Sequence, residues 1–342
     1  MPGPVLEVSG LKVEIPVTDT VLRPVRGIDL AVQPGETVAI VGESGCGKSL
    51  TALAIMGLLP RNARLTADRI ALMGESLTDL PQRRWRQLRG NRIAMIFQDP
   101  MTALDPCYRI GDQMTEVLRQ HRRVSRAAAR ERSLELLRKV GIPSPEERLG
   151  QYPHQLSGGL RQRIMIAMAL LCEPELIIAD EPTTALDVTI QAQILRLLRD
   201  IQRDTGVGLL LITHDLGVVA GMADRIVVMY GGEVVEIGAC DAVLGAALHP
   251  YTEGLMRSIP VPGETRQGET LGFIPGIVPR QTGDRTRCGF LERCPYARPA
   301  CADRPVPLRD TGGGHMMRCI LPPDGSGRDP GAWTRQSEAQ HE

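Results

Sequence analysis

The sequence predicts an α/β protein with a mostly parallel sheet covered by helices on both faces, followed by a loop-rich appendage. Two observations carry this prediction. Short apolar runs, typical of buried strands, alternate with helical stretches along the first 250 residues. After about residue 250, prolines recur and helical periodicity is lost. Strands are expected at 6–8, 11–15, 37–41, 176–179, 209–213 and 226–229, and helices at 49–59, 113–140, 160–171 and 190–205.

Composition excludes several classes of protein. The chain has 342 residues, which favours about two domains and a core that needs no disulfides. Its 40 basic and 40 acidic residues balance, and only 3% of residues are aromatic, which argues against nucleic-acid binding as its main task. The first residues lack a signal-peptide pattern, and the longest apolar run, at about 164–171, is too short to span a bilayer. We therefore expect a cytosolic protein with reduced cysteines.

A glycine-rich segment between a predicted strand and a predicted helix fits the phosphate-binding pattern G-x-x-x-x-G-K-[ST]. Glycines let backbone N–H groups turn toward an anion, and the following helix directs its positive end there. Lys48 would reach the β- and γ-phosphates, Ser49 would bind Mg²⁺, and Cys46 is interpreted as a small neutral residue. The predicted nucleotide loop, called the P-loop below, consists of Gly42, Glu43, Ser44, Gly45, Cys46, Gly47, Lys48 and Ser49.

Two consecutive carboxylates follow the apolar run 176–179. Asp180 would hold Mg²⁺, directly or through water. Glu181 would orient or deprotonate the water that attacks the γ-phosphate. An acidic pair after a strand is a weak signal alone, but it becomes strong beside a P-loop.

Residues 156–163 (LSGGLRQR) resemble the LSGGQ-like signature of ATP-binding-cassette (ABC) ATPases. The resemblance implies a P-loop NTPase fold with a RecA-like parallel core and a helical subdomain. Ser157 is expected to cap the helix that follows, while Gly158 and Gly159 leave backbone N–H groups open to an anion. The resemblance further implies that this signature closes over the ATP held by a partner cassette, in a head-to-tail pair.

The same resemblance assigns further roles, residue by residue. Gln98 is similar to the Q-loop glutamine, a contact to Mg²⁺ and the attacking water. Asp187, in Ala185-Leu186-Asp187, is similar to the D-loop residue at the dimer seam, and His214 to the switch histidine at the γ-phosphate. Ile15 departs from the pattern, because cassettes usually stack adenine on an aromatic ring there.

Further segments narrow the resemblance to the oligopeptide/dipeptide/nickel importer branch. They are QDPMTALDP at 98–106, HPYT at 249–252, and the stretches 274–279 and 293–297. The branch implies a peripheral ATPase at the cytoplasmic face of the inner membrane that powers peptide uptake. A second ATPase, two membrane permease subunits and a substrate-binding protein would complete the importer. The alternatives are a nickel or metal-chelate importer, and a soluble ABC ATPase acting on nucleic acid or ribosomes.

Four cysteines gather near the end of the chain with the spacing C-x5-C-x6-C-x17-C. In a loop-rich cytosolic segment this indicates a metal site that organises a weak core. The branch resemblance favours a [4Fe–4S] cluster, while zinc and unmetallated thiols stay open as alternatives. His315 is a spare ligand candidate. The predicted ligands are Cys288, Cys294, Cys301 and Cys319.

The predicted organisation has three parts. Residues 1–250 form the nucleotide-binding domain, with a core at about 1–98 and 164–250 and a helical subdomain at about 99–163. Residues 251–320 form the cysteine-containing C-terminal extension. Residues 321–342 are polar and rich in Gly and Pro, which predicts a disordered tail.

Overall fold

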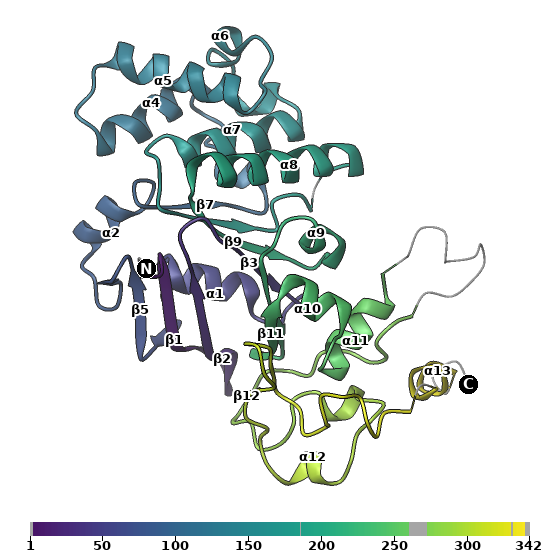
Figure 1. Ribbon diagram of the computed structural model, residues 1–342. Helices are drawn as coiled ribbons and strands as arrows, with labels where there is room; N and C mark the ends of the chain where they lie inside the picture. Colours follow the sequence, from purple (N-terminus) through teal and green to yellow (C-terminus); the bar gives the residue numbers. More distant parts are fainter. Residues whose placement is uncertain (1–2, 185, 260–271, 330, 339–342) are drawn as a thin grey trace. The chain divides into compact units, whose positions relative to one another are not determined.

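The computed structural model describes residues 3–184, 186–259, 272–329 and 331–338 (Figure 1). The chain forms two compact units. Unit 1 comprises Met1–Glu7, Ala31–Thr37 and Ala71–Ile212, and unit 2 comprises Val8–Leu30, Val38–Ile70 and Thr213–Glu342. Each unit therefore draws on separate stretches of the sequence. The predicted domain boundaries at residues 98, 163, 250 and 320 stay predictions.

Unit 1 contains parallel strands that are buried along their whole length. β7 (Ile93–Ile96) pairs with β8 (Leu176–Asp180), and β8 pairs with β9 (Gly208–Thr213), whose last residue lies in unit 2. Every residue of these three strands is buried. Burial on both faces explains why their sequences are continuous apolar runs.

Between β7 and β8, unit 1 forms a group of packed helices. In this group α4 contacts α5, and α3, α4 and α5 each contact α7. The sequence predicts one helix at 113–140, but two helices form there, because the Ser125 side chain accepts a hydrogen bond from the Ala128 N–H and starts the second. The helices are α2 (Gln82–Leu88), α3 (Pro100–Ala103), α4 (Ile110–His121), α5 (Arg126–Lys139), α6 (Pro145–Arg148), η1 (Pro153–Gln155), α7 (Gly158–Leu170) and α8 (Val188–Thr205).

Unit 2 has a mixed sheet to which the C-terminal extension contributes strands. β10 (Arg225–Tyr230) is parallel to β3 (Thr37–Val41) and antiparallel to β11 (Glu233–Ala239). β13 (Met316–Met317) pairs with β11 and with β12 (Arg309–Asp310). The remaining strands are β1 (Leu6–Val17), β2 (Thr20–Val32), β4 (Arg64–Thr66), β5 (Arg69–Leu72) and β6 (Glu75–Ser76). Of these, β4 lies in unit 2, β6 lies in unit 1, and the other three have residues in both units.

The core of unit 2 joins β10 to residues beyond 250 through aromatic rings. Tyr230 of β10 lies 4.7 Å from Tyr251 and 5.1 Å from Phe290, between ring centroids, and all three are buried. The helices of unit 2 are α1 (Lys48–Ile55), α9 (Leu216–Ala220), α10 (Cys240–Gly245), α11 (Pro250–Arg257), η2 (Leu291–Arg293), α12 (Ala300–Asp303) and α13 (Ala332–Glu338).

Helix α13 lies where the sequence predicts a disordered tail. Trp333 is 2% exposed, and its indole N–H donates to the Glu253 carboxylate at 2.8 Å. One buried aromatic side chain gives this polar segment enough apolar contact to order a short helix, which composition alone does not reveal.

Candidate nucleotide site and cysteine pocket

The P-loop of unit 2 connects β3 to α1, and its glycines have backbone conformations that other residues rarely adopt. Gly42, Gly45 and Gly47 have φ angles of 152°, 79° and 106°. A Cβ on Gly42 would lie 2.2 Å from the Met229 carbonyl oxygen, and one on Gly47 would lie 2.1 Å from that of Pro24. The backbone of β10 at Met229 and that of β2 at Pro24 therefore lie close to the loop, and only glycine fits at these two positions.

Lys48 begins α1 and is buried, with its ammonium group directed back at the loop. The Nζ atom donates to the carbonyl oxygens of Gly42 at 2.7 Å and Glu43 at 3.0 Å. Ser49 follows on the first helical turn. The N-cap residue, Gly47, has no side chain that could cap the N–H groups of this turn. The N–H groups of this turn are thus suited to an anion. Burial raises the pKa of the Cys46 thiol, which agrees with a neutral residue.

Three residues from the end of the cassette and from the extension hold the outside of the P-loop, and sequence reasoning missed all three as site residues. The Glu43 N–H donates to the Tyr251 hydroxyl at 2.8 Å. Arg293 donates to both carboxylate oxygens of Glu43, at 2.7 and 2.9 Å. The Gln281 side-chain amide donates to the Gly45 carbonyl oxygen at 2.7 Å. No local pattern signals contacts between residues more than 200 positions apart.

In unit 1 the structure brings together two of the predicted catalytic residues. The Gln98 side-chain amide donates to the Glu181 carboxylate at 3.1 Å, and Thr184 donates to the same oxygen at 2.9 Å. Glu181 has a φ of 45°, a left-handed conformation that is costly outside glycine. The preceding Asp180 is buried at the end of β8. Thr184 had no sequence signal beyond its place after the acidic pair.

The signature residues of unit 1 lie at the start of α7. Ser157 caps this helix by accepting from the Leu160 N–H at 3.4 Å, as predicted. Gly158 is exposed, and a Cβ on Gly159 would lie 3.0 Å from Ile190. Asp187 caps α8, accepting from the Ile190 N–H at 3.0 Å, which explains why this helix begins before the predicted residue 190. Ala185 lies outside the described residues.

His214 and Ile15 belong to unit 2. His214 is exposed directly after β9, and the next residue, Asp215, caps α9 by accepting from the Gly217 N–H at 2.8 Å. Ile15 is half-buried in β1. The P-loop and His214 thus belong to one unit, and Gln98, Asp180, Glu181 and the signature to the other.

The four cysteines of the extension line one small apolar pocket, with Phe290, Leu291 and Tyr296 among its other walls. Burial raises the pKa of Cys288 to about 11 and that of Cys294 to about 12, so both thiols are neutral at pH 7 when no metal is bound. The donor type suits iron or zinc. However, across the described ranges no three His, Cys, Asp or Glu side chains are placed to hold a metal ion.

His315, the spare ligand candidate, makes a different contact. Its Nε2 lies 2.8 Å from a carboxylate oxygen of Glu236, a residue with no exposed surface. The same carboxylate accepts from the N–H groups of Leu248 and His249. His315 therefore helps to hold the loop before α11 in this structure.

The sequence matches the family described as ABC transporter over residues 25–184, and that described as oligopeptide/dipeptide transporter, C-terminal region, over residues 235–301. A putative peptide import ATP-binding protein of Brucella melitensis is 50% identical over 327 residues, which cover 93% of this chain and 97% of that protein. The dipeptide transport ATP-binding proteins DppD of Bacillus subtilis and Escherichia coli are 52% and 46% identical. These matches cover 93% and 94% of this chain, and 94% and 98% of the relatives.

Solved structures agree with this similarity. The dimeric ATP-binding cassette MJ0796 bound to ADP and Pi has a TM-score of 0.62 and 27% identity, covering 69% of this chain and 98% of its own. The predicted P-loop NTPase cassette fold and the prediction of an ATPase are confirmed. The Brucella relative is 50% identical over 93% of this chain, and both family models match. The chain therefore belongs to the ATP-binding proteins of ABC transporters, in the oligopeptide/dipeptide branch.

Proposed function

We propose that this chain is the ATP-hydrolysing subunit of an importer that takes up peptides. The observation that carries the proposal is the pairing of an ABC cassette with the oligopeptide/dipeptide C-terminal region in one chain. The described ranges hold no helix long and apolar enough to cross a bilayer. Two membrane permease subunits, a substrate-binding protein and a second cassette would complete the importer. The chain would act at the cytoplasmic face of the inner membrane.

The roles proposed for the site residues combine the family resemblance with the chemistry of each side chain. Lys48 and the N–H groups of the P-loop would bind the ATP phosphates, and His214 would contact the γ-phosphate. Ser49, Gln98 and Asp180 would hold Mg²⁺, which supplies charge neutralisation when bound. Glu181 would orient or deprotonate the attacking water, and its contact with Gln98 supports this role.

The signature would serve the second cassette. Ser157, Gly158 and Gly159 already sit at a helix N-terminus, while the chain's own P-loop supplies the N–H groups for its own nucleotide. Asp187 would lie at the seam between the two cassettes. Two ATP molecules would then close a head-to-tail pair, and opening after hydrolysis would reset the permeases.

An uptake experiment tests the peptide assignment. Membrane vesicles containing the permeases, this chain and its partner cassette should accumulate a labelled dipeptide when binding protein and ATP are supplied. The matched control is the Lys48→Ala variant, which should abolish accumulation. Uptake of a nickel chelate in place of dipeptide would favour the first alternative. Co-sedimentation with ribosomes or DNA, without binding to the permeases, would contradict the importer assignment.

The cysteine pocket supports a second part of the proposal, a [4Fe–4S] cluster held by Cys288, Cys294, Cys301 and Cys319. Four thiols around one pocket supply the usual ligand number, although their present arrangement is not a ligand set. Anaerobic purification followed by iron and acid-labile sulfide analysis distinguishes the alternatives. Equal iron and sulfide support the cluster, zinc alone supports a zinc site, and neither metal leaves four free thiols.

A further inference from the structure

The P-loop is held from outside by the C-terminal extension, and one of these contacts is an ion pair. Arg293 is 4% exposed, and its guanidinium meets the carboxylate of Glu43 with two parallel hydrogen bonds of 2.7 and 2.9 Å. Such a bidentate contact fixes the relative orientation of the two side chains as well as their distance. Glu43 itself is the second residue of the P-loop, directly after Gly42.

All N–H groups of the Arg293 guanidinium are engaged. Besides the two bonds to Glu43, they donate to the carbonyl oxygens of Pro275 at 2.8 Å and Ile274 at 3.0 Å, and to the Tyr230 hydroxyl at 3.4 Å. A guanidinium has five N–H donors, and these five contacts account for each of them. Arg293 therefore has a single orientation, set by the extension on one side and the P-loop on the other.

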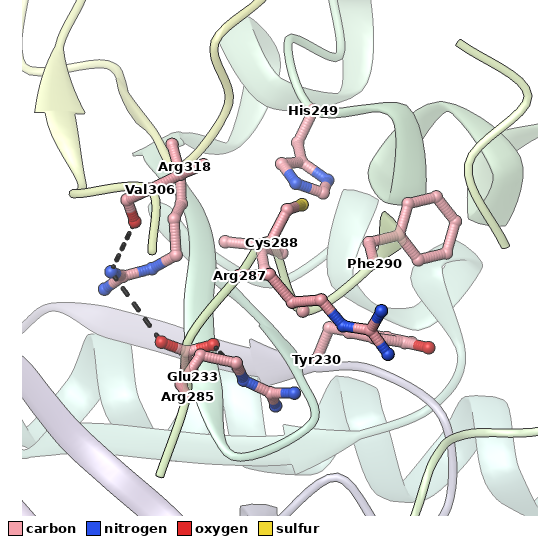
Figure 2. Close-up of a pocket in the computed structure, with 11 residues that line it drawn as sticks. Tyr230, Glu233, His249, Arg285, Arg287, Cys288, Phe290, Val306 and Arg318 are labelled. Atoms are coloured by element: carbon pink, nitrogen blue, oxygen red, sulfur yellow. Dashed lines mark hydrogen bonds and ion pairs between the residues drawn. The ribbon is translucent and has the colours of Figure 1, made fainter. Parts of the chain in front are cut away.

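The segment that carries Arg293 is firmly anchored on β10 and β11. Phe290, three residues earlier, packs edge-on against Tyr230. The Glu233 carboxylate of β11 lies 3.0 Å from the Arg285 Nε and 3.9 Å from the Arg318 Nη1. These three side chains are drawn in Figure 2. The segment is thus packed against both strands, and side chains supported in this way can fix the position of the loop they touch.

Glu43 is held at each of its polar groups. Its N–H donates to Tyr251, its carbonyl oxygen accepts from Lys48, and its carboxylate accepts from Arg293. Two of these three partners lie outside the P-loop. A half-exposed carboxylate within a phosphate-binding loop would repel ATP unless a cation neutralised it. Arg293 is the residue in direct contact with that carboxylate.

We propose that Arg293 is a positioning residue for ATP binding: it fixes the P-loop through Glu43 and neutralises a carboxylate that would otherwise add negative charge to the phosphate-binding loop. The extension would then contribute to the nucleotide site of its own chain. This inference rests on ATP binding by the P-loop and not on the cargo, so failure of peptide uptake would leave it intact.

The test compares binding of MgATP to the full chain by equilibrium titration. Arg293→Met keeps the aliphatic stem and removes the charge, and we expect the Kd to rise about tenfold. In the assembled transporter KM should rise similarly while kcat changes less than about twofold, because Arg293 would act on binding and not on the chemical step. The matched control is Arg287→Met, which removes an exposed pair with Glu292 from the same segment and should change neither value.

The double variant Glu43→Gln/Arg293→Met separates positioning from simple support of the extension. If Arg293 acts through the Glu43 carboxylate, its loss should not add to the loss caused by Glu43→Gln alone, and the double variant should have a Kd within about threefold of that of Arg293→Met. A double variant in which the two single losses multiply would overturn the proposal. Should Arg293→Met fail to fold, Arg293→Lys keeps the charge and at most one of the two contacts. Its Kd should rise about threefold, and an unchanged Kd would contradict the proposal.

Discussion

At the scale of single residues, Glu181 combines a costly backbone conformation with two polar partners. A left-handed φ outside glycine persists only where the surroundings enforce it, and such residues gather at functional sites. Gln98 and Thr184 both donate to the same carboxylate oxygen. These two hydrogen bonds orient the carboxylate, as its proposed role of directing water requires.

We expect Glu181→Gln to bind MgATP with nearly unchanged affinity and to lose at least about a hundredfold in kcat, because the amide cannot act as a base. Single-turnover hydrolysis and ATP titration on the same preparation measure the two effects. Glu173→Gln, which alters an exposed carboxylate paired with Arg132, is the matched control. Normal turnover by Glu181→Gln would remove Glu181 from its proposed role.

Two P-loop glycines offer a second comparison of single residues. Ala at Gly47 would clash with the Pro24 carbonyl, whereas a Cβ at Gly45 has nothing within 4 Å. Both have positive φ, so both substitutions cost about 1 kcal/mol of backbone strain. We expect Gly45→Ala to lower the free energy of unfolding by about that amount, and Gly47→Ala by more than about 3 kcal/mol. Equal losses in urea unfolding would contradict the close approach of Pro24.

At the scale of elements, the sequence predicts best those whose signal is local. The strands β3, β8 and β9 are apolar runs between turn residues, and they form within one residue of the predicted bounds. The break between α4 and α5 was missed because helical composition continues across it, while one serine cap decides where α5 starts.

Local sequence patterns do not predict the contacts that complete the candidate site. The P-loop, the acidic pair and the signature each have a short motif, so sequence reasoning names their residues as candidates, and the roles of these residues stay predictions. Arg293, Gln281 and Tyr251 lie more than 200 residues from the loop they touch, and only folding brings them there. Helix α13 was missed for the same reason, since its order depends on a distant contact.

Helix α13 gives a prediction at this scale. Trp333 is buried and bonded to Glu253, so Trp333→Ala should lower the free energy of unfolding by roughly 3–5 kcal/mol. Arg335→Ala removes a mostly exposed pair with Asp329 from the same helix and should cost less than about 1 kcal/mol. Chemical unfolding of the full chain measures both. A Trp333→Ala variant as stable as the parent protein would mean that α13 contributes nothing to the fold.

At the scale of the whole molecule, the extension is part of the structure of unit 2. Its strand β13 lengthens the sheet at β11, and Phe290 shares a core with Tyr230 and Tyr251. The same segment carries Arg293 to the P-loop and the cysteines to their pocket. The C-terminal segment is therefore integrated into the sheet of unit 2 and contacts its P-loop.

The signature tests whether the molecule works as one half of a pair. Ser157→Arg would place a bulky cation at the start of α7, where the proposed partner holds its ATP. We expect this variant to bind MgATP at its own P-loop with unchanged Kd, because Lys48 and the loop are untouched. ATPase activity of the assembled transporter should fall at least about tenfold.

Ser125→Arg is the matched control for this variant. Ser125 caps α5 through the same kind of bond that Ser157 makes in α7, at 3.1 and 3.4 Å. Both substitutions remove a helix cap worth about 1 kcal/mol, but only one lies in the signature. Equal activity of the two variants would contradict a composite site. Loss of ATP binding in isolated Ser157→Arg would instead place the signature at the chain's own nucleotide, and the head-to-tail pairing would have to be abandoned.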